Sequence, residues 1–265
     1  MQLPTDEIEV VIGDAPEHID EVLSVVHDGF VEAGYMEPQA TGRRMHVSYL
    51  NPGTCFALAR VDGEAIGAAV LVIDGPFGVP SDRSFAEEND RLRATHTAPL
   101  MECGSLVVRP QWRRHTRRVF MRLISALTRI SLVEWPESPV VITVSPQSER
   151  FYAGILGMRR VAEERPLFGP PALALHPGTI LDMVAHTALR ESPGQRAMNR
   201  LIVETDPSWL HDLRTGRGID DALLRDLVTG QGLGDRLQDQ IRFLAARHPA
   251  ALRAMMSEAG APLHA

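Results

Sequence analysis

The feature that most constrains the fold is a short run at residues 140–144, Val-Val-Ile-Thr-Val, which is almost wholly apolar. A strand with one face in water alternates apolar and polar side chains, whereas a strand covered on both faces reads as a continuous apolar run. The run therefore predicts a strand in the middle of a sheet. Such a strand needs neighbouring strands and covering helices, and the flanking sequence carries patterns for both.

Strand and helix patterns alternate through the first two thirds of the chain. Apolar runs predict strands, and apolar residues at helical spacing predict helices. Asp62-Gly63 lies between two such runs, which is typical of a tight β-hairpin turn. The predicted strands are residues 8–12, 55–61, 65–73, 100–108, 140–144, 158–163 and 172–176, and the predicted helices are residues 16–30, 84–94, 116–132 and 147–156.

The pattern changes near residue 178, after which only helical spacing is found. Apolar residues share one helical face within residues 219–227, and others do so within residues 233–244. We therefore expect an α/β domain at residues 1–178 and a helical extension at residues 179–265.

Composition excludes several classes of function. All 27 basic residues are arginine, so no lysine is available for Schiff-base or phosphate-clamp chemistry. A net charge of −7 disfavours general nucleic-acid binding. The chain has two isolated cysteines and does not start like a signal peptide, so we expect a cytoplasmic protein. It has no long apolar run, so we expect no membrane span. The histidines have no metal-ligand spacing, so no metal site is expected.

Glu102 is the one carboxylate inside the apolar strand at 100–108. Burying a carboxylate is costly unless it is paired or protonated, and partial burial raises its pKa toward the range of a general base. The alternative is a structural glutamate paired with an arginine or exposed at the strand end.

Arginines are concentrated at residues 109–122, where six occur with no acid among them. Arg114, Arg117, Arg118 and Arg122 are spaced to fall on one face of the helix that follows. Arginine clusters and helix N-termini both bind anions, so the segment favours a phosphate or an acidic partner. The alternative is a solvated helix face.

A third segment, Phe151-Tyr152-Ala-Gly-Ile-Leu-Gly157-Met, combines aromatic residues with a glycine at a helix end. Core packing and a helix C-cap explain most of it. The alternative is that Tyr152 presents its hydroxyl to a cleft as a proton donor.

The order of these elements resembles the GNAT (GCN5-related N-acetyltransferase) superfamily over residues 5–177. The resemblance implies an α/β (α+β) fold, with a mixed central sheet that has helices on both faces. It also implies that the strands at 100–108 and 140–144 separate, so that the pantetheine arm of a thioester donor lies between them.

Several segments are similar to one subgroup, the FeeM-like N-acyl amino acid synthases, distant relatives of acyl-homoserine-lactone synthases. They are residues 78–93 (Gly-Val-Pro-Ser-Asp-Arg-Ser-Phe and onward), Glu102-Cys-Gly-Ser-Leu-Val-Val108, Val144-Ser-Pro146 and Glu164-Arg-Pro166. The resemblance implies transfer of a long acyl chain from acyl carrier protein to the amine of an amino acid, without a covalently bound cofactor.

Two departures from the relatives bear on the donor and the reaction. The GNAT phosphate loop is glycine-rich, but this chain has Gln111-Trp-Arg-Arg-His-Thr116, which crowds a CoA diphosphate and favours a carrier protein with a single phosphate. Ser105 replaces the arginine of the lactone synthases, which disfavours lactone synthesis.

The resemblance implies a role for each candidate residue. Glu102 would accept the amine proton and Tyr152 would protonate the departing thiolate. Backbone groups at Ser105, Leu106, Val107 and Val108 would polarise the thioester carbonyl, and Arg113, Arg114, His115 and Thr116 would hold the donor phosphate. Arg114, Arg117, Arg118 and Arg122 would attract the carrier protein, and Arg43 and Arg44 would bind the acceptor carboxylate. An acetyl-CoA-dependent GNAT enzyme and a non-catalytic acyl-binding module remain the alternatives.

Overall fold

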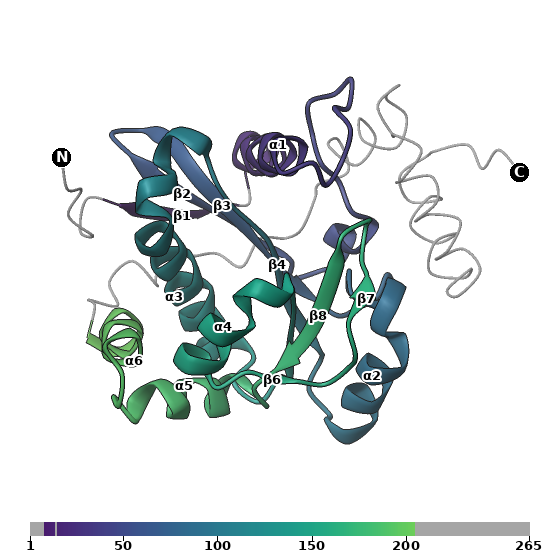
Figure 1. Ribbon diagram of the computed structural model, residues 1–265, viewed down its shortest axis with the longest axis vertical. Helices are drawn as coiled ribbons and strands as arrows, with labels where there is room; N and C mark the ends of the chain where they lie inside the picture. The colour runs from purple at the N-terminus through teal and green to yellow at the C-terminus, as the bar shows by residue number, and fades with distance from the viewer. Residues whose placement is uncertain (1–7, 14, 205–265) are drawn as a thin grey trace, which may run out of the picture.

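The computed structural model describes residues 8–13 and 15–204, and its centre is one eight-stranded mixed sheet (Figure 1). The strands are β1 (Glu9–Gly13), β2 (Cys55–Val61), β3 (Glu64–Ile73), β4 (Met101–Val108), β5 (Val140–Val144), β6 (Arg159–Arg160), β7 (Arg165–Pro166) and β8 (Pro171–His176). They follow the order β1-β2-β3-β4-β5-β8-β6, and β7 also pairs with β8. β4 and β5 are parallel, and the other pairs are antiparallel.

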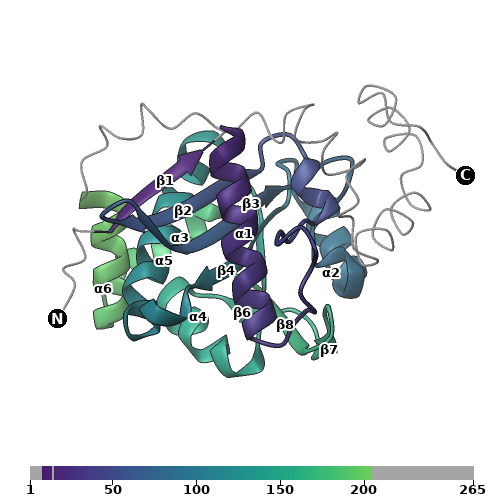
Figure 2. The same ribbon diagram turned by 90° about the horizontal axis from the view of Figure 1, so that it is seen from above.

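Helices cover both faces of the sheet, as expected. The α-helices are α1 (Pro16–Glu32), α2 (Asp82–Thr95), α3 (Thr116–Glu134), α4 (Glu149–Leu156), α5 (Ile180–Ala188) and α6 (Pro193–Asn199). Short 3-10 helices span Val47–Leu50, Pro110–His115 and Pro146–Ser148, and a π-helical turn spans Arg200–Glu204. Figures 1 and 2 show α1 on one face of β2 and β3 and α3 on the other.

The sheet separates two apolar cores because its strands are buried on both sides. Leu71 of β3 and Ile142 of β5 face the core that α3 and α4 complete. Val70 and Val141 face the core that α1 completes. The prediction of a central strand at 140–144 is confirmed, since β5 lies between β4 and β8.

Local sequence explains the turn between β2 and β3, but it overestimates the length of the strand that precedes β7 and pairs with β8. Asp62 (φ 51°) and Gly63 (φ 80°) form the two-residue turn between β2 and β3, in the left-handed region that a type I′ turn requires. A strand lies within the predicted range 158–163 and pairs with β8, but it is shorter than expected, because only Arg159–Arg160 pairs and a separate β7 follows. Pro166, which lacks an N–H, helps keep the second pairing short.

The core on the α3 side continues past residue 178. Ile180 and Met183 of α5, Met198 of α6 and Ile202 are buried in it. Thus the first part of the predicted extension packs with the sheet domain, while the helices predicted within 219–227 and 233–244 lie outside the described residues. Within the described ranges, no helix is long and apolar enough to cross a membrane.

Candidate active site

The sheet opens between β4 and β5. Only two residue pairs, Met101 with Val140 and Glu102 with Val141, join these parallel strands. Beyond them β4 stays on β3 and β5 stays on β8, so the two strands diverge. The expected separation of the strands is therefore present, and Glu102 lies at the last paired position.

A β-bulge lies on β4 beside the opening. The register of β3 and β4 shifts between Ala68 and Val70, opposite Ser105, whose φ is 51°. A bulge leaves one extra residue outside the ladder and releases its backbone groups from pairing. The bulge therefore makes backbone N–H groups near Ser105 and Leu106 candidates to polarise a carbonyl in the opening.

Glu102 is buried, with 1% of its surface exposed. Its Oε2 accepts a hydrogen bond from the Ser81 amide at 2.7 Å, and its Oε1 accepts one from the Thr143 hydroxyl at 3.2 Å. Burial raises the pKa of Glu102 to about 7, the bonds from Ser81 and Thr143 oppose the rise, and Asp82 adds to it. A carboxyl with this pKa exchanges a proton readily near neutral pH.

Two cavities share the residues of the opening. The Glu102 cavity, of about 410 Å³, is lined by Val70 and Val72 on the α1 side of the sheet, together with Glu102 and Arg44. The Tyr152 cavity, of about 330 Å³, is lined by Leu71 and Ile142 on the α3 side, together with Tyr152 and Cys103. The two cavities share seven lining residues, namely Phe30, Tyr35, Gly104, Ser105, Thr143, Val144 and Ser145. The opening therefore places Glu102 and Tyr152 in different cavities with a common border.

Tyr152 stands on α4 between two phenylalanine rings, with centroids 5.4 Å from both Phe120 and Phe151. Burial, and then the neighbouring Cys103, raises the pKa of Tyr152 above its ordinary value. Burial and Glu102 also raise the pKa of the Cys103 thiol to about 12. Tyr152 is therefore a hydrogen-bond donor across the neutral range, and Cys103 is a thiol and not a nucleophilic thiolate.

The two neighbouring arginines predicted to bind the acceptor have different surroundings. Arg44 lines the Glu102 cavity, donates to the hydroxyls of Tyr49 (2.9 Å) and Ser105 (3.0 Å), and stacks over Phe30. Arg43 lines neither cavity, and its guanidinium pairs with Asp20 in two hydrogen bonds. The geometry therefore retains Arg44 as the acceptor-binding candidate and not Arg43.

The arginine segment does not form the single helical face expected. Residues 110–115 form a 3-10 helix and α3 begins only at Thr116, because His115 (φ −107°, ψ 6°) lies outside α-helical geometry. Arg122 is half-buried and donates to the Ile8 carbonyl at 3.1 Å. Arg114 and Arg117 are exposed, whereas Arg118 is half-buried.

The predicted phosphate-binding residues also have partners within the protein. Arg113 lines the Tyr152 cavity and pairs with Glu32 of α1 at 2.8 Å. Arg114 donates to His115 at 2.9 Å, and the exposed Thr116 hydroxyl donates to the Arg113 carbonyl at 2.7 Å. Burial and the charges of Arg114 and Arg118 lower the pKa of His115, so its neutral ring accepts the bond from Arg114.

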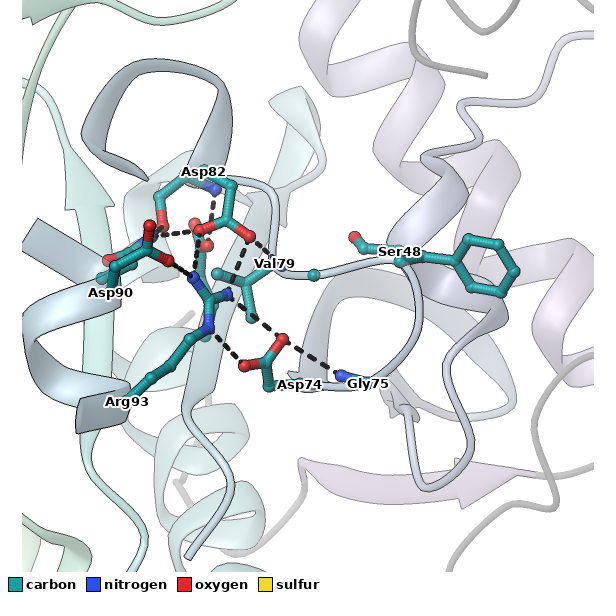
Figure 3. A network of polar contacts seen from close by, with 12 residues as sticks. Ser48, Asp74, Gly75, Val79, Asp82, Asp90 and Arg93 are labelled. Carbon is teal, nitrogen blue, oxygen red and sulfur yellow. Dashed lines mark hydrogen bonds and ion pairs between the residues drawn. The ribbon is translucent and has the colours of Figure 1, made fainter. Parts of the chain in front are cut away.

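Sequence reasoning missed a polar cluster at the start of α2, which Figure 3 shows. Arg93 bonds to both carboxylate oxygens of Asp82 and to Asp74, while Asn89 donates to Asp82 and to the Ser81 hydroxyl. Asn89 and Arg93, four residues apart, lie on one face of α2, whereas Asp82 precedes the kink at Phe85. The spacing of Asn89 and Arg93 is the signal that could have revealed that part of the cluster.

The fold and the opening define the class of protein. The open mixed sheet, with helices on both faces and a split between β4 and β5, is the fold of a GNAT-like acyltransferase. Residues 21–176 match the sequence profile described as "N-acyl amino acid synthase FeeM", and the chain therefore belongs to the FeeM family of N-acyl amino acid synthases. No curated protein sequence matches the chain significantly.

Solved structures support the fold assignment. FeeM from uncultured soil microbes superposes with a TM-score of 0.55 and 17% identity, over 75% of this chain and 98% of that one. The AHL synthase LasI gives a TM-score of 0.53 and 17% identity, over 66% and 94% of the two chains. TofI, solved with an inhibitor and MTA, gives a TM-score of 0.50 and 18% identity, over 71% of this chain and 99% of that one.

Proposed function

We propose that the enzyme transfers a long acyl chain from the phosphopantetheine thioester of acyl carrier protein to the amine of an amino acid. One observation carries this proposal: two cavities meet at the opening between β4 and β5, one lined by the buried Glu102 and the other by Tyr152 and apolar side chains of α3, α4 and α5. We further propose a cytoplasmic location, which the two free cysteines support.

The Tyr152 cavity suits the acyl chain. Apolar side chains from α3, from the end of α4 and the segment after it, and from α5 line it, namely Ile124, Leu127, Leu156, Met158, Ile180 and Met183. Its volume of about 330 Å³ lies in the range of small-molecule sites. An acetyl group leaves most of such a cavity empty, whereas a long chain gains free energy by leaving water for it. The cavity therefore favours a long-chain donor.

The Glu102 cavity suits an amino acid. Arg44 presents a guanidinium to the cavity, and arginine forms strong, paired hydrogen bonds with a carboxylate. Glu102 lines the same cavity and accepts protons near neutral pH. An acceptor with a carboxylate and an adjacent ammonium group presents one charge to each side chain. This pairing favours a free amino acid over an uncharged amine.

The reaction follows from these positions. Glu102 takes a proton from the ammonium group, and the amine nitrogen forms a bond to the thioester carbonyl carbon. Backbone N–H groups at the Ser105–Leu106 bulge stabilise the oxyanion. The carbon–sulfur bond then breaks, and the sulfur leaves with the proton of Tyr152. The nitrogen loses the second ammonium proton to solvent as the amide forms, and solvent returns a proton to Tyr152. The proton on Glu102 passes to solvent and restores the base.

The segment before α3 favours a carrier protein over free CoA. In a glycine-rich loop, several backbone N–H groups converge on a diphosphate. Here the Trp112 amide is bonded to the Arg109 carbonyl and the Thr116 amide to the Arg113 carbonyl. Arginine side chains remain for a single phosphate, and the exposed Arg114 and Arg117 offer charge to an acidic protein.

A thiol-release assay tests the function. Long-chain acyl carrier protein, long-chain acyl-CoA and acetyl-CoA are each offered with a panel of free amino acids and with their amides, and the product mass is measured. We expect amide product from the long-chain carrier protein and loss of turnover with the acceptor amides. Turnover with acetyl-CoA alone would support an acetyltransferase instead, and acyl binding without any product would support a binding module.

A further inference from the structure

The orientation of the base Glu102 depends on a backbone group of another segment, the residue that precedes α2. The Ser81 amide, immediately before α2, donates to Glu102 Oε2 at 2.7 Å. A backbone amide holds a carboxylate in one orientation only when its own segment is fixed. The contacts that hold residues 78–82 in place therefore set the orientation of the Glu102 carboxyl group.

Asp82 fixes that segment from within. Its Oδ2 accepts a hydrogen bond from the Val79 amide at 2.9 Å, which closes a tight turn around Ser81. The carboxylate occupies the space where a side chain at residue 78 would lie, because a Cβ on Gly78 would approach Asp82 Oδ2 to 2.3 Å. Gly78 also has a φ of 62°, which glycine adopts without strain. The turn and Asp82 thus form one compact unit.

Arg93 holds Asp82 in place, as Figure 3 shows. Its two terminal nitrogens donate to the two carboxylate oxygens of Asp82 at 2.9 and 2.8 Å, and its Nε donates to Asp74 at 2.6 Å. Although burial lowers the pKa of Arg93, the bonds with Asp74 and Asp82 outweigh it and hold that pKa above its ordinary value. The guanidinium therefore links the end of β3 to the start of α2 and balances the charge of Asp82.

We propose that Arg93 is a positioning residue for acyl transfer: through Asp82 it aims the Ser81 amide at Glu102 and offsets the charge of Asp82 beside that base. The proposal rests on the proposed function, in which Glu102 is the base. Arg93 lines neither cavity and acts through Asp82 and Ser81. Among the described residues, the titratable and polar groups near Glu102 are Asp82 of α2, Cys103 of β4, Thr143 of β5 and Arg44, which lines the same cavity.

The test uses a second buried carboxylate of α2 as a matched control. Glu88 is 7% exposed and pairs with Arg165 of β7, away from the Asp82 cluster. Asp82→Asn and Glu88→Gln each remove one buried negative charge from the same helix. Both are expected to lower stability, because each removes one charged hydrogen-bond partner of a buried or half-buried arginine. Only Asp82→Asn removes a charge that acts on Glu102.

The titration of Glu102 is followed by carboxyl ¹³C NMR in the full chain, with Glu102→Gln to assign the signal. We expect Asp82→Asn to lower the midpoint on the order of 0.5 pH unit, Arg93→Met to raise it, and Glu88→Gln to leave it unchanged. In thiol release, Arg93→Met should lower kcat about tenfold with little change in the KM of the donor, because the base is misplaced and not the donor.

The results separate the two proposals. Midpoints that coincide in the wild type, Asp82→Asn and Arg93→Met would overturn the role of Arg93. If Arg93→Met does not fold, an unchanged Glu102 midpoint in Asp82→Asn is sufficient to overturn the proposed role of Arg93. Shifted midpoints in a wild-type protein that transfers no acyl group would leave the electrostatic link in place and contradict the proposed function.

Discussion

The two cavities at the sheet opening have similar volumes and common border residues, yet they differ in which groups line them. An arginine and a glutamate line each cavity: Arg44 and the buried Glu102 in one, and Arg113 in its ion pair with Glu32 in the other. Apolar side chains of α3, α4 and α5 line the Tyr152 cavity and not the Glu102 cavity. Alternation along β4 produces the difference, because Glu102 and Cys103 face opposite sides of the sheet. In the proposed function, this opening separates proton transfer and carboxylate binding from the site of the acyl chain.

Among substitutions in the Glu102 cavity, Glu102→Gln should lower the rate of acyl transfer the most. Without a proton acceptor, we expect kcat to fall by about 10² to 10⁴, because general base catalysis contributes that much. In the wild type, kcat/KM should fall as the pH drops below about 7, since Glu102 then becomes protonated. Thiol release across pH 5–9 measures both effects, and a variant with wild-type turnover contradicts the assignment of the base.

The same substitution should stabilise the protein at high pH. Because burial raises the pKa of Glu102 to about 7, the folded state holds a proton that the unfolded chain has lost. Stability contributed by this group therefore falls as the pH rises from its unfolded pKa through about 7. Thermal unfolding at pH 8 should occur at a higher temperature for Glu102→Gln than for the wild type. A lower temperature would indicate that the carboxylate is structural.

Arg44→Met should raise the KM of the amino acid about 10- to 100-fold, because a charge-assisted hydrogen bond to its carboxylate is lost. Arg43→Met provides the matched control, since Arg43 pairs with Asp20 and lines neither cavity. Initial rates against acceptor concentration measure both values. Equal changes in the two variants would remove Arg44 from the acceptor site.

Met183→Trp tests the apolar cavity. A larger side chain at this lining position shortens the cavity, so turnover of a long-chain donor should fall about tenfold relative to a short-chain donor. Leu181→Trp on the same helix is the control, because Leu181 is 49% exposed. If Met183→Trp changes the rates with long and short donors equally, the acyl chain lies elsewhere.

Charge reversal of Arg114 and Arg117 should give the smallest effect. We expect kcat/KM with acyl carrier protein to fall about tenfold or less at low salt, and the loss to shrink as salt rises. The exposed Arg91 on α2 provides the control substitution. A salt dependence identical to that of the wild type would exclude these arginines from carrier-protein binding.

The sequence predicted the parts of the site that depend on hydrophobic pattern. An apolar run marked β5 as central, and a lone carboxylate within an apolar strand marked Glu102 as unusual. The pattern could not distinguish Arg43 from Arg44, because adjacent residues of a loop diverge according to tertiary contacts. Nor could it reveal the bulge at Ser105, whose positive φ arises from the register of β3 against β4. The link from Arg93 to Glu102 joins α2 to β4, and no local spacing encodes it.

The most direct test of the account is a crystal structure of the enzyme with a non-hydrolysable long-chain acyl-pantetheine. We expect the pantetheine arm to pass between β4 and β5, the carbonyl oxygen to lie against the Ser105–Leu106 backbone, and the acyl chain to fill the Tyr152 cavity toward Met183. An acyl chain bound in the Glu102 cavity, or a donor outside the opening, would contradict it.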